Sequence, residues 1–254
     1  MCRTDWGRRI RAVARLGVLV SATGEAAVVI QFDLRKSTHQ KHGPNAAGRP
    51  RTILDRKYAL LADVPRAVLR RLAVFAGEFT LEAASTVVAC TNLHRSDVAP
   101  GLVALQASSL LSVRGEGAFA RYLLSHQTRA FALAKLACNR ELDAVGRSHA
   151  EYLQCVFEYA EIELERGEPS QWMVHYGRLI EDVRTALDWA FSPSGDAAIG
   201  VGLTMAAIPL WLLSSRSDEL CSRIGRALKS EAAAICGCEM RLRTAGRLAG
   251  MSNF

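Results

Sequence analysis

The sequence predicts a mainly α-helical protein, in which a winged-helix module is followed by an arm of antiparallel helical repeats. Three observations lead to this prediction. Aromatic residues make up 7% of the chain and there are seven prolines, a composition that favours helices. From residue 63 onward, apolar residues recur at helical spacing. One pair of strand-like segments around a glycine-rich turn interrupts the helices near residue 115, as in a module of three helices and a hairpin.

The first 51 residues are predicted to be a basic, poorly ordered head. Residues 1–57 hold twelve Lys or Arg and four acids, a balance of +8, so the remaining residues sum to −1 within the total of +7. Residues 24–33 could form a strand, whereas residues 36–51 are polar and contain Gly43-Pro44 and Gly48-Arg-Pro50, which are typical of a loop. Such a head could bind nucleic acid or an anionic membrane, but a solvated tail is the preferred interpretation. No apolar run is long enough to cross a bilayer, so no membrane partner is expected.

Residues 52–138 are predicted to form the winged-helix module. Apolar positions between residues 64 and 76 give the first helix one buried face, with Asp63 as its N-cap and Gly77 at its end. Thr80 is expected to cap the second helix. The third helix is expected over residues 97–111, followed by strands at 110–113 and 119–124 and a helix at 128–138.

The predicted third helix contains no Lys or Arg, so it offers little to a phosphate backbone. Within it, only Gln106 and the serines could meet a base edge. Its apolar side predicts a packing interface, which is expected either to be partly exposed or to pack against the arm; the residues are Leu102, Leu105 and Leu110. The candidate nucleic-acid contacts of the module are on the hairpin instead, and they are Arg114 and Arg121.

Residues 139–254 are predicted to form the arm, incomplete at its end. Helices are expected over residues 142–166, 170–191, 196–213, 219–235 and 239–251, joined by short turns that favour antiparallel pairs. His126 and His149 are expected to be polar boundary residues near helix starts. No clean 34-residue repeat consensus is present.

No catalytic, cofactor or metal site is predicted. The chain has no P-loop, HExxH, GxSxG or CxxC motif, and His39 and His42 lack companion ligands. The expectation is therefore a protein that is not an enzyme and that uses no cofactor. Seven cysteines without a disulfide-framework spacing favour a reducing, cytoplasmic setting.

Several segments together resemble one family, although each alone is a weak match. These segments are residues 66–77 (RAVLRRLAVFAG), 79–84 (FTLEAA), 121–124 (RYLL), 128–133 (TRAFAL), 149–152 (HAEY), 180–191 (IEDVRTALDWAF) and 195–199 (GDAAI). As a set they resemble bacterial STAND-class, NB-ARC-like ATPases that act as transcriptional regulators, over roughly residues 52–250. Complete members have a DNA-binding domain, a nucleotide-binding domain, a winged helix and a tetratricopeptide-like superhelix. The resemblance implies that the winged helix packs on the nucleotide-binding domain and that the superhelix senses inducers or partners.

The chain departs from this family in informative places. Glu78 stands where the family usually has a second glycine, and residues 106–109 replace a region that usually contains a lysine. No position matches a Walker motif, and residues 1–50 do not resemble a nucleotide-binding domain. The hypothesis is a truncated or frameshifted gene product whose head comes from an unrelated frame.

Three functions remain open from the sequence. The first is a non-catalytic regulatory fragment that binds a protein partner, such as a nucleotide-binding domain or a paralogue. The second is a DNA-binding regulator that acts through the winged helix or the basic head. The third is an ATPase, which the missing P-loop disfavours.

Overall fold

A computed structural model describes residues 52–90, 92–230, 232 and 242–246 of the chain. The chain divides after residue 51, and every described residue lies in the second unit, Thr52–Phe254. The strand and loop predicted for the head lie outside the described residues, as does most of the last predicted helix. Among the residues that are described, no helix is long and apolar enough to span a membrane.

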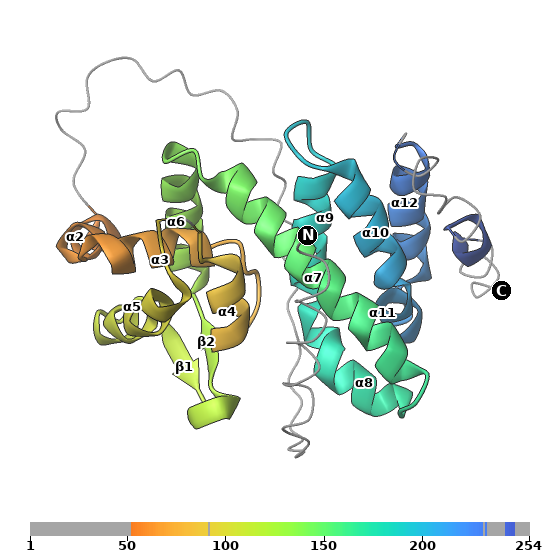
Figure 1. The fold of residues 1–254 in the computed structure, drawn as a ribbon, viewed down its shortest axis with the longest axis horizontal. Coiled ribbons are helices and arrows are strands. Elements are labelled where there is room, and N and C mark those ends of the chain that lie inside the picture. The colour runs from red at the N-terminus through yellow and green to blue at the C-terminus, as the bar shows by residue number, and fades with distance from the viewer. Residues whose placement is uncertain (1–51, 91, 231, 233–241, 247–254) are drawn as a thin grey trace. The chain divides into compact units, whose positions relative to one another are not determined.

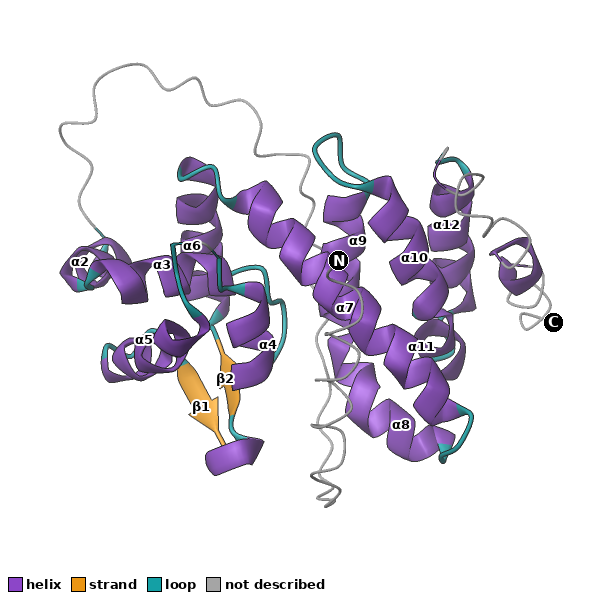
Figure 2. Cartoon of the chain, viewed as in Figure 1, coloured by secondary structure: helices purple, strands orange, loops and turns teal. Residues whose placement is uncertain are grey.

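The described chain is mainly helical, which confirms the predicted class (Figure 1, Figure 2). Its two strands have three residues each and form one antiparallel hairpin. The elements up to residue 138 are α2 (Ile53–Leu60), α3 (Asp63–Leu72), α4 (Leu81–Val87), α5 (Arg95–Ala107), β1 (Ser112–Arg114), the short 3-10 helix η2 (Gly117–Phe119), β2 (Arg121–Leu123) and α6 (His126–Cys138). The sequence prediction missed α2, which buries no residue completely.

Two predicted helix starts in this part can be compared with the structure. Thr80 caps α4 as predicted, because its hydroxyl accepts the Ala83 N–H at 3.0 Å. Asp63 is the first residue of α3 rather than its N-cap, which is Ala62.

The third helix was placed two residues late, and the prediction that it has no basic residue was wrong. α5 begins at Arg95, because the Asp97 carboxylate reaches back to accept the His94 N–H at 3.1 Å, which fixes the start of the helix two residues before Asp97. It ends at Ala107, and Ser109 adopts a left-handed conformation with φ of 53°. The Leu110 N–H then bonds back to the Leu105 carbonyl at 3.0 Å, which closes the helix end.

The second part of the chain is helical throughout. Its elements are α7 (Leu142–Leu164), α8 (Pro169–Tyr176), the 3-10 helix η3 (Gly177–Leu179), α9 (Ile180–Ala190), α10 (Ala197–Ala206), α11 (Ile208–Leu213) and α12 (Ser217–Leu228). We call residues 142–228 the arm, and residues 52–138 the module. In the arm α7, α9 and α10 pack on one another, and α10 and α11 pack on α12.

Two helices predicted as continuous in the arm are each broken. Residues 170–191 divide at Gly177, a poor helix former that begins the 3-10 turn η3. Residues 196–213 divide at Ala207, since Pro209 has no N–H to continue the hydrogen-bond ladder of α10.

The described residues build two hydrophobic cores. The first joins α3, α4, α5 and α6, and its largest completely buried side chains are leucines such as Leu69, Leu72 and Leu105. The second lies among the arm helices around Phe157 and Trp211. Tyr152 of α7 packs against both cores, so the two hydrophobic interiors meet along this helix.

Candidate functional site: the hairpin surface and a buried joint

The hairpin presents the two arginines predicted as nucleic-acid contacts. Arg114 and Arg121 are direct partners in the β1–β2 register, so their side chains leave the same face of the sheet. The Arg114 side chain is 74% exposed, and its guanidinium forms an ion pair with Glu78 at 3.0 Å. Arg121 is half-buried. The structure therefore brings both predicted residues together, and it adds an acid that neutralises one of them.

The outer face of α5 is nearly uncharged. Its exposed positions include Pro100, Val103 and Gln106, and Val103 is 66% exposed. The one basic residue, Arg95, is used at the start of the helix, where its Nε donates to the Ser85 carbonyl at 3.2 Å. The middle of this helix has no cation for a phosphate.

The predicted packing residues of this helix and the following segment are buried. Leu102, Leu105 and Leu110 are at most 3% exposed and belong to the first core, where α5 packs mainly on α3 and α4. These three leucines were expected to be partly exposed or to pack against the arm, and both expectations were wrong. The close approach of the helices explains their burial, because a Cβ on Gly101 would lie 2.8 Å from Val68 Cγ2 of α3.

A buried polar joint links the module to the arm. Asp182 of α9 is 1% exposed, and its Oδ1 accepts the Ala76 N–H from the loop after α3 at 2.7 Å. His149 of α7, also 1% exposed, places its Nε2 3.6 Å from the same oxygen. The ring of Phe75 meets the His149 imidazole edge to face, with centroids 5.1 Å apart.

Arg129 of α6 completes this joint. Its Nε donates to the Phe75 carbonyl at 2.7 Å, which holds the loop from the module side. Burial lowers the pKa of Arg129, and the negative charge of Asp182 opposes that shift. His149 Nε2 and Asp182 Oδ2 have no hydrogen-bond partner within the described part of the chain. The joint is therefore polar but incompletely satisfied by the described residues, a costly arrangement for buried groups.

A second tie joins α3 to the beginning of α7. Glu141 accepts from Arg70 Nε at 2.9 Å and from Arg71 Nη2 at 2.8 Å. Burial alone would raise the pKa of Glu141, but the two guanidinium hydrogen bonds outweigh it, so this pKa lies below its usual value of 4.5.

Sequence reasoning missed the joint and placed one member wrongly. His149 was expected at a polar boundary, yet it lies in the buried stripe of α7 with Ala150 and Leu153. Asp182 likewise falls among Val183 and Ala186 on the buried face of α9. The available signal was a charged residue on an otherwise apolar helix face, which marks a buried polar contact.

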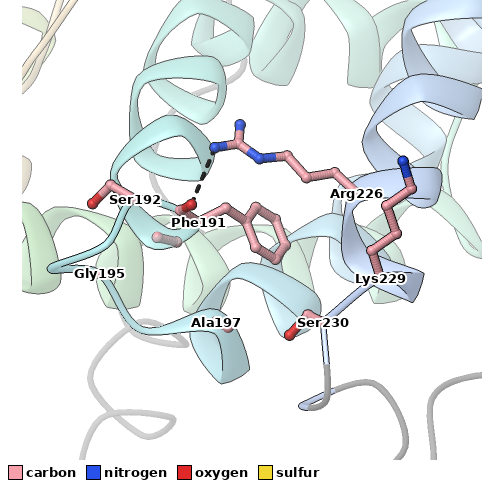
Figure 3. A pocket seen from close by; sticks show the side chains of 8 residues that line it. Phe191, Ser192, Gly195, Ala197, Arg226, Lys229 and Ser230 are labelled. Atoms are coloured by element: carbon pink, nitrogen blue, oxygen red, sulfur yellow. Dashed lines mark hydrogen bonds between the residues drawn. The ribbon is translucent and has the colours of Figure 1, made fainter.

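A hollow of about 270 Å³ lies between the α9–α10 turn and the end of α12 (Figure 3). Phe191, Ser192, Arg226 and Lys229 line it, and Arg226 Nη2 donates to the Phe191 carbonyl at 3.3 Å. It is smaller than typical small-molecule sites of about 300–1,000 Å³ and widely open. The described residues also contain no group of three or more His, Cys, Asp or Glu side chains able to hold a metal.

The sequence is similar to mycobacterial proteins that carry one common description. The chain is 28% identical over 162 residues to proteins from Mycobacterium bovis and from two strains of Mycobacterium tuberculosis, each named "Putative HTH-type transcriptional regulator". The match covers 63% of this chain and 18% of each relative, so the chain spans less than a fifth of their length. No protein-family model matches, and no solved structure matches significantly.

Proposed function

We propose that the described residues are a non-catalytic regulatory segment of a transcriptional regulator, made of a winged-helix module and a helical-repeat arm. The names of the relatives support the regulatory role, and the order of three helices and a hairpin supports the winged helix. The proposal includes the STAND-class origin that the sequence segments suggest, and the absence of nucleotide chemistry.

The observation that carries the proposal is the buried joint. The Ala76–Asp182 hydrogen bond ties the module to the arm, and the ion pairs of Arg70 and Arg71 with Glu141 tie it to the N-cap of α7. A partner bound to the arm can therefore change the position of the module, which is what a regulatory segment requires. The partner we propose is a protein, either a nucleotide-binding domain or a paralogue.

The test is transcriptional. Deleting the gene in its host should change a defined set of transcripts, and wild-type protein should restore them. Asp182→Ala at equal protein level should fail to restore them, whereas Asp188→Ala on an exposed part of the same helix should succeed. A deletion that leaves every transcript unchanged would refute the regulatory role. Binding of ATP by the purified chain at micromolar affinity would refute its non-catalytic nature.

A second candidate is direct DNA binding through the module or the basic head. The names of the relatives support this candidate more directly than they support the arm of an ATPase. Arg95 at the start of α5 adds a specific observation, because residues at the beginning of a third helix are those that meet base edges in helix-turn-helix proteins. Mobility-shift titrations of duplex DNA at several salt concentrations test it.

A further inference from the structure

Three arginines from separate elements gather around the loop that follows α3. Arg114 and Arg121 leave one face of the hairpin as register partners. The loop reaches the hairpin, since Phe79 and Tyr122 exchange backbone hydrogen bonds at 3.0 and 2.9 Å. It also reaches η3, where a Cβ on Gly77 would lie 3.6 Å from the Arg178 carbonyl. Residues 77–79 thus lie between the hairpin and Arg178.

The charges of this group are poorly balanced. Arg178 is exposed, and its Nε donates to the His175 carbonyl at 2.9 Å. Neither Arg121 nor Arg178 forms an ion pair with a carboxylate in the described part of the chain, whereas Arg114 pairs with Glu78. Burial lowers the pKa of Arg178, the positive charge of Arg121 lowers it further, and the negative charge of Glu78 opposes the shift, which places all three charges within electrostatic reach.

We infer that Arg114, Arg121 and Arg178 form one surface that binds the phosphodiester backbone of duplex DNA, and that Glu78 weakens this binding. The inference rests on the second candidate function and adds the place of contact. Guanidinium groups match phosphate oxygens in geometry and charge. The surface spans the module and the arm, so it bypasses the uncharged face of α5. Duplex DNA is the partner that fits relatives named as HTH-type regulators.

Glu78 is the second functional element of this surface. Glu78 forms an ion pair with Arg114 in the free protein, so a phosphate must compete with the Glu78 carboxylate for the Arg114 guanidinium. Other acids also lie near this group. Glu82 and Asp182 act together with Arg121 on the Tyr152 hydroxyl, and Glu163 acts together with Arg178 and Arg121 on His175. Removing the Glu78 charge should therefore strengthen binding, in the direction opposite to any arginine substitution.

The test uses the full chain and the fluorescence anisotropy of a labelled 20-base-pair duplex between 50 and 200 mM NaCl. One variant carries Arg114→Gln, Arg121→Gln and Arg178→Gln. The matched control carries Arg166→Gln, Arg216→Gln and Lys229→Gln, which removes the same charge from exposed positions of the arm. The control is needed because the basic residues before residue 58 add binding of their own.

Each arginine that neutralises one phosphate contributes about 0.9 to the slope of log affinity against log salt. The variant that lacks Arg114, Arg121 and Arg178 should therefore have a slope smaller in magnitude than that of the wild type by about 2.7. Over the fourfold change in salt, the wild type should lose about 40-fold more affinity than this variant. The control should keep the wild-type slope, and Glu78→Gln should tighten binding by up to about fivefold, as expected for the release of an exposed ion pair.

Equal slopes for the variant and its control would overturn the proposed surface while leaving DNA binding by the head or Arg95 in place. Unchanged affinity of Glu78→Gln would overturn the role of Glu78. No binding by the wild type at 50 mM NaCl would refute both the surface and the DNA-binding candidate. The regulatory proposal would remain, because its test is transcriptional. Matching circular dichroism and unfolding midpoints would show that the substitutions leave the fold intact.

Discussion

Replacing Asp182 by alanine should weaken the connection between the module and the arm. The carboxylate accepts the Ala76 N–H at 2.7 Å inside a buried joint, where a hydrogen bond to a charged group contributes about 1.5–3 kcal/mol. The alanine variant also leaves the Ala76 N–H buried without a partner, at a cost of about 1–3 kcal/mol. Relief of an incompletely satisfied carboxylate offsets part of this loss, since Oδ2 has no partner among the described residues. We expect a net destabilisation of about 2–3 kcal/mol.

Urea unfolding measures this value, and two substitutions serve as controls. Asp182→Asn keeps an oxygen acceptor at the same position and should lose only about 1 kcal/mol. Asp188→Ala, in an exposed ion pair on the same helix, should lose less than about 1 kcal/mol. A loss below about 0.5 kcal/mol for Asp182→Ala would refute the argument that this hydrogen bond holds the joint.

The tryptophans allow the joint itself to be observed. Trp172, Trp189 and Trp211 all lie in the arm, whereas helices of both parts contribute to circular dichroism. In a Trp6→Phe background, fluorescence should report the arm alone. The two probes should give one midpoint for the wild type and separate midpoints for Asp182→Ala, because the module then unfolds independently. Separate midpoints in the wild type would contradict the proposed coupling.

Three further predictions concern stability and pH. Gly101→Ala should destabilise by about 1–3 kcal/mol in urea unfolding, because its Cβ would meet the buried Val68 at 2.8 Å; Gly225→Ala, whose Cβ would meet nothing within 4 Å, should not. Ser215→Gly should raise the free energy of unfolding by about 0.5–1 kcal/mol, since Ser215 holds a left-handed conformation with φ of 55°; no gain would refute strain there. Glu141 has a lowered pKa in the folded chain, so its contribution is present above its ordinary pKa of 4.5 and is lost as pH falls through the folded value. Urea midpoints of Glu141→Gln and wild type should therefore differ at pH 7 and approach each other as the pH falls below 4.5, and a constant difference would contradict this linkage.

Helical periodicity was sufficient to predict the helical class and the order of most elements. The ends of helices were less predictable, because they depend on single side chains that can act at several positions. Asp97 is a good N-cap by type, but it acts at the third helical position and moves the start of α5 to Arg95. Ser109 ends the same helix although its residue type rarely adopts a left-handed conformation.

The candidate site was predicted only where its residues lie close in sequence. The turn between Arg114 and Arg121 brings them together, so a hairpin prediction was enough to pair them. Arg178 lies near them because η3 packs against the loop after α3. Gly77 of that loop and Arg178 are about a hundred positions apart in the sequence. His149 and Asp182 meet for the same reason, by the contact of α7 with α9. Pairwise packing of distant helices is not encoded in any local pattern.

The loop at residues 75–79 connects the buried joint with the arginine surface of the hairpin. Phe75 and Ala76 face the arm, where they contact His149 and Asp182, whereas Glu78 pairs with Arg114 on the hairpin. The loop has five residues, and Phe75 stacks on Phe79 with centroids 4.7 Å apart, a contact of about 0.5–1.5 kcal/mol that couples its two ends. A displacement of α9 that breaks the Asp182 hydrogen bond would therefore also disturb the Glu78–Arg114 pair. If the proposed DNA-binding surface holds, we expect such a displacement to change whether Arg114 is free to meet a phosphate.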